Sequence, residues 1–304
     1  MDGKLDSIVP AKPSCPPKTR LEMPNPFRHE RGVVRMIEPP GADREALAER
    51  IVAGTYGKPF VIDDGVMREL YFKREIVQSG MRLDDPYALD FAYTRLAMAF
   101  LLFHPDPKRI LLLGLGGGSL SKFCHRNLPK ADLTTVEIDA DVIALRDEFL
   151  VPPDGPLFHV VHDDAARFVA REGGFDAIVL DCFDPDGYSP SVMTREFFLD
   201  ARDALTKKGV LVSNLVGKKD ERVAQLDLIR AAFGDNVVLL PDKEDGNLVV
   251  FVFRDPNFEP RWRWMAGEAP ALKKRFGLDY PRFAQKLERS RKLRYLERTL
   301  GEAA

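Results

Sequence analysis

The stretch ILLLGLGGGSLSKF, residues 110–123, leads from an apolar segment through a glycine cluster into a segment with helical spacing. Glycines after a strand allow a tight turn and let backbone N–H groups approach a ligand that a side chain would hold away. The cluster is not a full GxGxxG motif, because Ser119 stands at the last glycine, and no P-loop lysine follows. A nucleotide-type site and a merely tight turn therefore both stay open. The candidate residues are Gly114, Gly116, Gly117, Gly118 and Ser119.

Apolar runs and helical segments alternate after this stretch, which predicts a parallel sheet covered on both faces. The segment NVVLLPDKEDGNLVVFVFR, residues 236–254, joins two apolar runs through a loop too short for a crossover helix, so these two strands must be antiparallel. This combination favours an α/β fold with a doubly wound sheet of the class I S-adenosylmethionine methyltransferase type. It argues against a two-halved dinucleotide-binding domain and an NAD dehydrogenase. The other strands are expected near 109–114, 133–138, 157–161, 176–181 and 209–215.

Four segments follow from composition and patterning. Residues 1–30 are rich in proline and poor in large apolar residues, which predicts a flexible leader. Residues 31–85 are expected to form a small β domain, with a hairpin turning at Asp64-Gly65. Residues 86–257 form the Rossmann-like domain, and residues 258–304 form a basic helical tail that we expect to pack on its own domain or on a neighbouring subunit.

Composition excludes several function classes. The net charge is −2 with 30% charged residues, which gives no general attraction to nucleic acid. No apolar run approaches the length that spans a bilayer. The three cysteines are scattered without CxxC spacing, so neither a disulfide framework nor a metal site is expected. We therefore expect a cytoplasmic protein.

Acidic residues follow the second and third predicted strands. Glu137 ends the stretch TTVE, where an acid can accept hydrogen bonds from both ribose hydroxyls, and Asp139 follows closely. Asp164 or Asp163, after the third strand, can accept from an adenine amino group. The alternative is that these two acids cap the following helix, which we favour for Asp163. A buried Glu137 without a partner would be costly, which favours a ligand there.

The fourth strand, within FDAIVLDCFDPDG at residues 175–187, ends in Asp181, and Asp184 follows. Ligands of such sheets bind at the carboxyl ends of the strands, so both acids should face the same crevice as the glycine turn. Two carboxylates there can hold a cationic amine and take its proton as it attacks. A turn in which Asp184 bonds its own backbone is the alternative for that residue.

Taken together, LLLGLGGGSL, TTVEID, HDDAARF and LDCFDPDG followed by TREFF resemble the spermidine synthase family of polyamine aminopropyltransferases. The resemblance spans residues 57–253, including the β cap and the helix that begins at DFAY. It implies transfer of an aminopropyl group from decarboxylated S-adenosylmethionine to putrescine or a related amine. It also implies that Glu137 binds ribose, Asp164 meets adenine and Asp181 activates the amine. By the same resemblance, Asp184 helps to hold the amine and Tyr93 lines its channel.

The chain also departs from this family. Members usually carry an acid after the three glycines, which pairs with the ammonium of the aminopropyl group and repels the carboxylate of intact S-adenosylmethionine, whereas this chain has Ser119. Thr94 replaces the usual glutamine after the helix tyrosine, and YSPSV replaces a Pro-Ala-Glu segment. The diamine site is therefore altered.

Two enzyme hypotheses follow, and both are displacements at a carbon next to a sulfonium. One is aminopropyl transfer, which we place first, and the other is methyl transfer from intact S-adenosylmethionine to a small molecule. A non-catalytic nucleoside-binding protein ranks last, because it leaves Asp181 and Asp184 unexplained. We expect a small-molecule amine as partner, a homodimer, and no metal, membrane or nucleic acid. The aromatic and basic RWRWM at 261–265 is expected to be part of a helix, and Tyr188 to close over the substrate as a lid.

Overall fold

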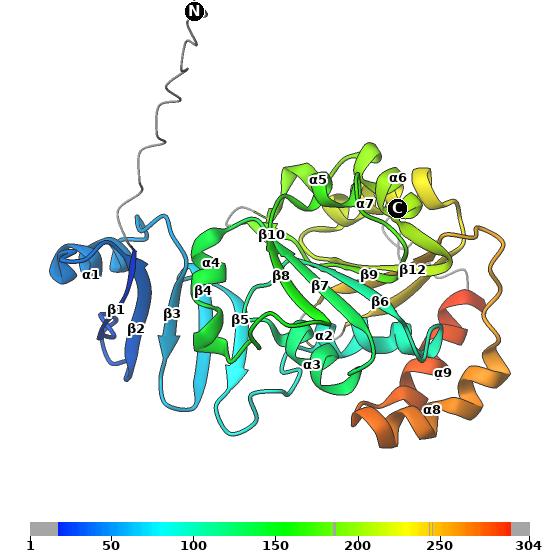
Figure 1. Cartoon of the computed structure of the whole chain (residues 1–304), viewed down its shortest axis with the longest axis horizontal. Helices are drawn as coiled ribbons and strands as arrows, with labels where there is room; N and C mark the ends of the chain where they lie inside the picture. Colours follow the sequence, from blue (N-terminus) through cyan, green and yellow to red (C-terminus); the bar gives the residue numbers. More distant parts are fainter. Residues whose placement is uncertain (1–17, 185–186, 243, 245, 293–304) are drawn as a thin grey trace, which may run out of the picture.

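The computed structural model describes residues 18–184, 187–242, 244 and 246–292. At its centre lies a seven-stranded sheet in the order β13-β14-β12-β9-β6-β7-β8 (Figure 1). Within this sheet only β14 runs antiparallel to the other strands, because it pairs antiparallel with both β12 and β13. The predicted fold class is therefore confirmed, including the antiparallel closing hairpin. The strands are β6 (Arg109–Leu113), β7 (Asp132–Glu137), β8 (Phe158–His162), β9 (Phe175–Leu180), β12 (Leu205–Leu215), β13 (Val237–Pro241) and β14 (Leu248–Phe253).

Strand β6 shows why this sheet is covered on both faces. Its side chains alternate, so Ile110 and Leu112 join one buried hydrophobic cluster, whereas Leu111 and Leu113 join another. Each cluster is closed by helices, and short helices also follow the strands that carry the candidate site. The helices of the domain are α3 (Ser119–Asn127), α4 (Ala140–Ala144), α5 (Ala165–Val169), α6 (Arg195–Ala204) and α7 (Lys219–Phe233), with 3-10 turns η2 (Arg146–Phe149) and η3 (Pro190–Val192).

A separate five-stranded antiparallel sheet forms the N-terminal part, with its strands in sequence order (Figure 1, blue to cyan). The hairpin predicted at Asp64-Gly65 is confirmed, because β3 and β4 pair across it. The flexible leader predicted for residues 1–30 is wrong for its last part, because β1 pairs along its whole length with β2. Residues 1–17 lie outside the described residues. The elements are β1 (Thr19–Pro24), β2 (Val33–Glu38), α1 (Arg44–Val52), β3 (Phe60–Asp63), β4 (Met67–Lys73) and β5 (Ile76–Arg82).

Buried ion pairs join the N-terminal sheet to the main domain. Glu148 of η2 is 5% exposed and lies 3.4 Å from Arg35 of β2 and 3.8 Å from Arg68 of β4, and it also pairs with Arg20 of β1. The two arginines Arg35 and Arg68 share Asp63 at 2.7 and 2.6 Å. Each of these carboxylates pairs with at least two arginines, and this attraction offsets the free-energy cost of removing the charges from water. We name Arg20, Arg35, Asp63, Arg68 and Glu148 the interdomain ion cluster.

Helical segments connect and flank the two sheets. The predicted helix before β6 is present as α2 (Ala92–Ala97), which continues as the 3-10 turn η1 (Met98–Leu102). At the other end, α8 (Trp262–Phe276) and α9 (Tyr280–Lys292) pack against η1 and β13, with Phe276 and Leu287 in the core (Figure 1, orange to red). Residues 293–304 of the predicted tail lie outside the described residues. Within the described part of the chain, every helix is too short or too polar to cross a membrane.

Candidate active site

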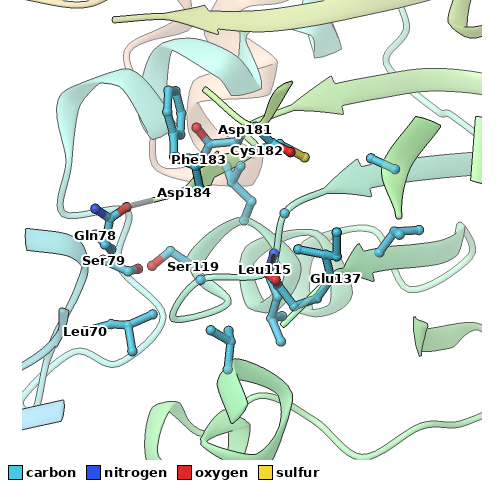
Figure 2. Close-up of a pocket in the computed structure, with 18 of the residues that line it drawn as sticks. Leu70, Gln78, Ser79, Leu115, Ser119, Glu137, Asp181, Cys182, Phe183 and Asp184 are labelled. Carbon is cyan, nitrogen blue, oxygen red and sulfur yellow. Dashed lines mark hydrogen bonds between the residues drawn. The ribbon is translucent and has the colours of Figure 1, made fainter. Parts of the chain in front are cut away.

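A pocket lies at the carboxyl ends of the parallel strands and holds about 1030 Å³ of empty space that opens to solvent. Strands β6, β7, β8 and β9 supply its floor, α2 one side, and β5 of the N-terminal sheet another. This is the edge at which open α/β sheets bind ligands. Figure 2 shows Gln78, Ser79 and Ser119 together on one side, Glu137 on another, and Asp181 with Cys182 at the top.

Gly114 brings the glycine turn against the end of β9. A Cβ at this position would lie 2.2 Å from the carbonyl oxygen of Asp181, and the residue has φ +98°. The Asp181 N–H donates to the carbonyl oxygen of Leu113 at 2.9 Å, which fixes the same approach. Glycine is thus required here for the contact between two strand ends, in addition to any room that it leaves for a ligand.

The rest of the turn divides into residues that line the pocket and residues that support it. Gly116 and Ser119 line it, whereas Gly117 and Gly118 do not. A Cβ at Gly117 would lie 2.7 Å from Ser79 Oγ and 2.9 Å from the Phe149 ring, so the N-terminal sheet closes directly onto the turn. The prediction that all four glycines meet a ligand is therefore not supported for Gly117 and Gly118, whose side of the turn is filled by the chain itself.

Glu137 stands at the end of β7 with both carboxylate oxygens engaged. Its Oε2 accepts from the Leu115 N–H at 2.9 Å, and its Oε1 accepts from the Asp139 N–H at 2.9 Å. Burial raises the pKa of Glu137, and the backbone N–H groups of Asp139 and Leu115 oppose that rise. The hydrogen-bond partners that a buried Glu137 requires are thus backbone N–H groups, which the sequence does not reveal. The backbone N–H of Gly116 also lowers the pKa of Glu137, so three backbone groups act on a carboxylate that has about four acceptor positions.

The three other acids of this edge have local partners. Asp139 caps α4 by accepting from the Asp141 and Val142 N–H groups, and it does not line the pocket. Asp164 caps α5, accepting from the Arg167 N–H at 3.0 Å. The capping role that we favour for Asp163 is not found, because Asp164 is the cap, whereas Asp163 accepts from the Asp164 N–H at 2.8 Å and pairs with Arg171 at 2.5 Å, which lowers the pKa of Asp163. Asp163 and Asp164 both line the pocket.

Asp181 is a half-buried carboxylate at the end of β9. The Tyr93 hydroxyl donates to its Oδ2 at 2.9 Å, and the Asn214 amide donates to its Oδ1 at 3.1 Å. Burial raises the pKa of Asp181, and these two neutral donors act in the opposite direction. No cation accompanies Asp181 among these hydrogen bonds, and a raised pKa suits a group that takes up a proton near neutral pH.

Asp184 lies in a short hairpin over the pocket. Strand β10 (Phe183–Asp184) pairs with β11 (Gly187–Tyr188), and Asp184 lines the pocket. Tyr188, expected to move as a lid, is tied down here: its hydroxyl donates to the Asn214 carbonyl oxygen at 3.0 Å and accepts from the Val216 N–H. The hairpin is therefore held on β12 by the hydroxyl of a half-buried tyrosine.

The sequence analysis did not identify three residues that contribute to the site. Gln78 and Ser79 line the pocket from β5, and Asn214 holds Asp181 from the end of β12. Asn214 carries a signal in the sequence, because it is a polar residue near the end of an apolar strand, as Asp181 and Glu137 are. Gln78 and Ser79 carry none, because their place depends on how the two sheets dock.

The pocket therefore combines Glu137, held by backbone N–H groups, with Asp181, held by two neutral side chains, and with a wall of neutral residues on another side. That wall is formed by Gln78, Ser79, Gly80, Leu115, Gly116 and Ser119. Among the described residues, no group of three His, Cys, Asp or Glu side chains is arranged to hold a metal ion. Cys182 also lines the pocket, where burial and the charges of Glu137 and Asp181 raise the pKa of its thiol and keep it protonated.

Known proteins resemble this chain in sequence and in fold. A polyamine aminopropyltransferase of Chromobacterium violaceum is 36% identical over 232 residues, which cover 76% of this chain and 89% of that protein. A lysine and N-terminal methyltransferase homolog for eEF1A of Drosophila pseudoobscura pseudoobscura is 30% identical over 171 residues, 52% of this chain and 25% of that protein.

A probable spermidine synthase from Corynebacterium glutamicum has the same fold, with a TM-score of 0.58 at 22% identity over 75% of this chain and 91% of that one. Residues 90–223 match the spermine/spermidine synthase domain, a segment that holds Tyr93, the glycine turn, Glu137, Asp181 and Asp184. The chain belongs to the spermine/spermidine synthase family.

Proposed function

We propose that this chain is an aminopropyltransferase that moves the aminopropyl group of decarboxylated S-adenosylmethionine to a small-molecule amine. The observation that carries the proposal is the placement of Asp181, half-buried at the end of β9 and held by Tyr93 and Asn214, in the same pocket as Glu137. Membership of the family and the resemblance to a polyamine aminopropyltransferase over most of both chains support it.

In the proposed arrangement, Glu137 accepts from the ribose hydroxyls, and Asp163 and Asp164 lie on the adenine side. The glycine turn with Gly114, Gly116 and Ser119 faces the donor. The amine nitrogen bonds to the carbon next to sulfur, the C–S bond breaks with its electron pair passing to sulfur, and methylthioadenosine leaves. Asp181 takes the proton that the amine loses, and Asp184 holds the amine from the hairpin.

Methyl transfer from intact S-adenosylmethionine is the second candidate, and one observation favours it. The wall formed by β5 and the glycine turn presents neutral side chains, including Ser119, so no carboxylate of that wall attracts the ammonium of a decarboxylated donor or repels the carboxylate of the intact one. The resemblance to a methyltransferase over half of the chain agrees with this alternative.

Binding calorimetry and product analysis separate the two reactions. We expect decarboxylated S-adenosylmethionine to bind about tenfold more tightly than intact S-adenosylmethionine, and the acceptor to gain one aminopropyl group by mass spectrometry. The opposite order of affinity with a gain of one methyl group would establish methyl transfer. Binding of methylthioadenosine without turnover of either donor on any amine would point to a nucleoside-binding protein. The homodimer and the cytoplasmic location stay predictions.

A further inference from the structure

Asn214 lies behind the proposed base and does not line the pocket. It stands near the end of β12, whose preceding residue Ser213 pairs with Leu180 of β9, so Asn214 reaches the carboxylate of Asp181 from the neighbouring strand. The distance from Asn214 Nδ2 to Asp181 Oδ1 is 3.1 Å. Asn214 is 5% exposed, so this hydrogen bond is shielded from water.

The orientation of the Asn214 amide is fixed by chemistry. In the ionised form that a base must have, the Asp181 carboxylate only accepts hydrogen bonds, so the amide turns its N–H toward Asp181 in that form. Its Oδ1 is then buried without a hydrogen-bond partner. Burying an unsatisfied carbonyl oxygen costs free energy, whereas an apolar side chain of similar size would avoid that cost. The chain thus keeps a locally unfavourable amide at the one place where its N–H meets Asp181.

Tyr93 and Asn214 donate to different oxygens of the same carboxylate. Two donors from two elements, α2 and β12, fix both the position and the plane of the Asp181 carboxylate. One donor alone would leave it free to rotate about the bond that carries it. A base works best when its free lone pair points at the proton it takes.

We propose that Asn214 is a positioning residue for the acceptor amine's base, holding Oδ1 of Asp181 so that the remaining lone pairs face the amine. The inference rests on the proposed role of Asp181 as base. Asn214 acts through Asp181 and contacts neither the nucleoside nor the amine. Its removal changes how the proton is taken and leaves nucleoside binding intact.

Other titratable groups also face this carboxylate. Tyr93 comes from α2, Cys182 follows it in the chain, and Tyr188 comes from β11. Glu137, Asp164 and Asp184 line the same pocket. Because each of these stays in place when Asn214 is replaced, a change in the pH profile of an Asn214 variant reports on the lost amide.

The test compares Asn214→Leu and Asn214→Ala with Ser213→Ala. Ser213 is the matched control, because it is buried on the same strand and its hydroxyl has no partner to lose. The measurements are methylthioadenosine binding, the pH dependence of kcat/KM for the acceptor amine, and the titration of the Asp181 carboxyl followed by carbon-13 NMR.

For the Asn214 variants, we expect methylthioadenosine affinity within about twofold of the parent and kcat/KM lower by about tenfold or more at neutral pH. The acidic limb of the profile and the Asp181 titration should both move to higher pH, because a donor to the charged form is lost. Ser213→Ala should leave all three measurements unchanged.

Several results would overturn the proposal. One is a parental pH profile in the Asn214 variants, another is an equal loss in Ser213→Ala, and a third is loss of methylthioadenosine binding together with activity in both Asn214 variants, which indicates a structural role. If the parent chain turns over neither donor but the Asp181 titration still moves in Asn214→Leu, the proposed function fails while the positioning contact stands.

Discussion

Asp181 carries a charge in a place that favours the neutral form. Its pKa is raised by burial, although Asn214 and Tyr93 donate to it. A carboxyl group whose folded-state pKa is raised stabilises the fold only while it is protonated, and that contribution is lost as pH rises through the folded pKa. Wherever Asp181 is ionised, as its proposed role as a base requires, the chain holds that charge at some expense of stability, as active sites often do.

We expect Asp181→Asn to raise the free energy of unfolding at pH 7 by about 1 kcal/mol while lowering transfer by about 100-fold or more. The asparagine keeps the size of the side chain and can still bond Asn214 and Tyr93. Urea unfolding and initial rates measure the two effects. The stability gain should vanish as pH is lowered through the pKa of Asp181, and a destabilised variant at pH 7 would contradict the prediction.

Lys122 is a second buried charge, on α3 just after the glycine turn. Its Nζ donates to the Phe149 carbonyl oxygen at 2.8 Å and lies 3.1 Å from Met81 Sδ. Burial, followed by the charge of Arg68, lowers the pKa of Lys122 from 10.5 to about 8. The folded chain therefore gives up this proton more readily than the unfolded chain, so the stability that depends on Lys122 rises with pH between these two values.

Comparison with Lys122→Met isolates this effect from other titrations. Relative to the variant, the free energy of unfolding of the parent chain should increase by about 2 kcal/mol between pH 7 and pH 9.5. Urea unfolding at the two pH values gives the difference. Parallel pH dependence in the two proteins would show that the Lys122 amine titrates as it does in the unfolded chain.

Two of the predicted site residues share one feature, which is a polar side chain at the end of an apolar strand. Asp181 and Glu137 follow this pattern and both line the pocket. Their partners were not predictable in the same way. Backbone N–H groups satisfy Glu137, and Asn214 comes from a strand that is adjacent only in the folded sheet, so the pairing depends on strand order.

Among the elements, the hairpin of β10 and β11 shows how a loop becomes fixed. Two residues on each side pair antiparallel, the Phe183 and Tyr188 rings lie 4.8 Å apart, and the Tyr188 hydroxyl contacts β12. Because Asp184 lies in this hairpin, the tyrosine sets how firmly the amine side of the pocket is held.

Tyr188→Phe keeps the ring pair and removes only the hydroxyl. The Val216 N–H then loses its acceptor, and we expect a loss of about 1–2 kcal/mol in the free energy of unfolding. The KM for the amine should rise severalfold, with methylthioadenosine affinity unchanged, because the nucleoside side lies on other strands. Steady-state kinetics and calorimetry test this, and an unchanged KM would show that the hydroxyl does not set the hairpin.

The predicted elements are confirmed where apolar residues form a clear pattern in the sequence. The prediction is wrong where a strand is held mainly by pairing with a neighbouring strand. The buried strands of the main sheet are apolar runs flanked by turn residues, and their positions are confirmed. Strand β1, TRLEMP, is largely exposed, so its sequence predicts a leader and not a strand. It is ordered by its backbone pairing with β2 and by Arg20 in the interdomain ion cluster.

At the scale of the whole molecule, the docking of two sheets completes the site. The fold class could be predicted, because alternating strands and helices allow few topologies. The contribution of β5 to the pocket could not be predicted from the sequence. Gln78 and Ser79 reach the pocket only when the N-terminal sheet docks on the main domain. The interdomain ion cluster is the buried polar part of that contact.

Glu148→Ala should weaken this contact, because it removes the buried carboxylate that faces Arg20, Arg35 and Arg68, while Asp63 still pairs with Arg35 and Arg68. We expect a loss of about 2–3 kcal/mol in the free energy of unfolding, as for other lost hydrogen bonds to charged groups. Methylthioadenosine binding should weaken as well, because the β5 wall loosens. Asp84→Ala is the control, since its 2.6 Å pair with Arg82 is exposed and should contribute less than about 1 kcal/mol. Equal effects of the two substitutions would refute a special role for the cluster.

The wall from β5 also bears on how such enzymes diverge. On the proposed function, the ribose contact and the proton acceptor lie in the main sheet, whereas Gln78 and Ser79 belong to a different structural unit. Substitutions in that unit can alter which sulfonium substituent is accommodated while the inherited chemistry of the main sheet is preserved. Such changes would lie in the N-terminal sheet, outside residues 90–223, which match the spermine/spermidine synthase domain.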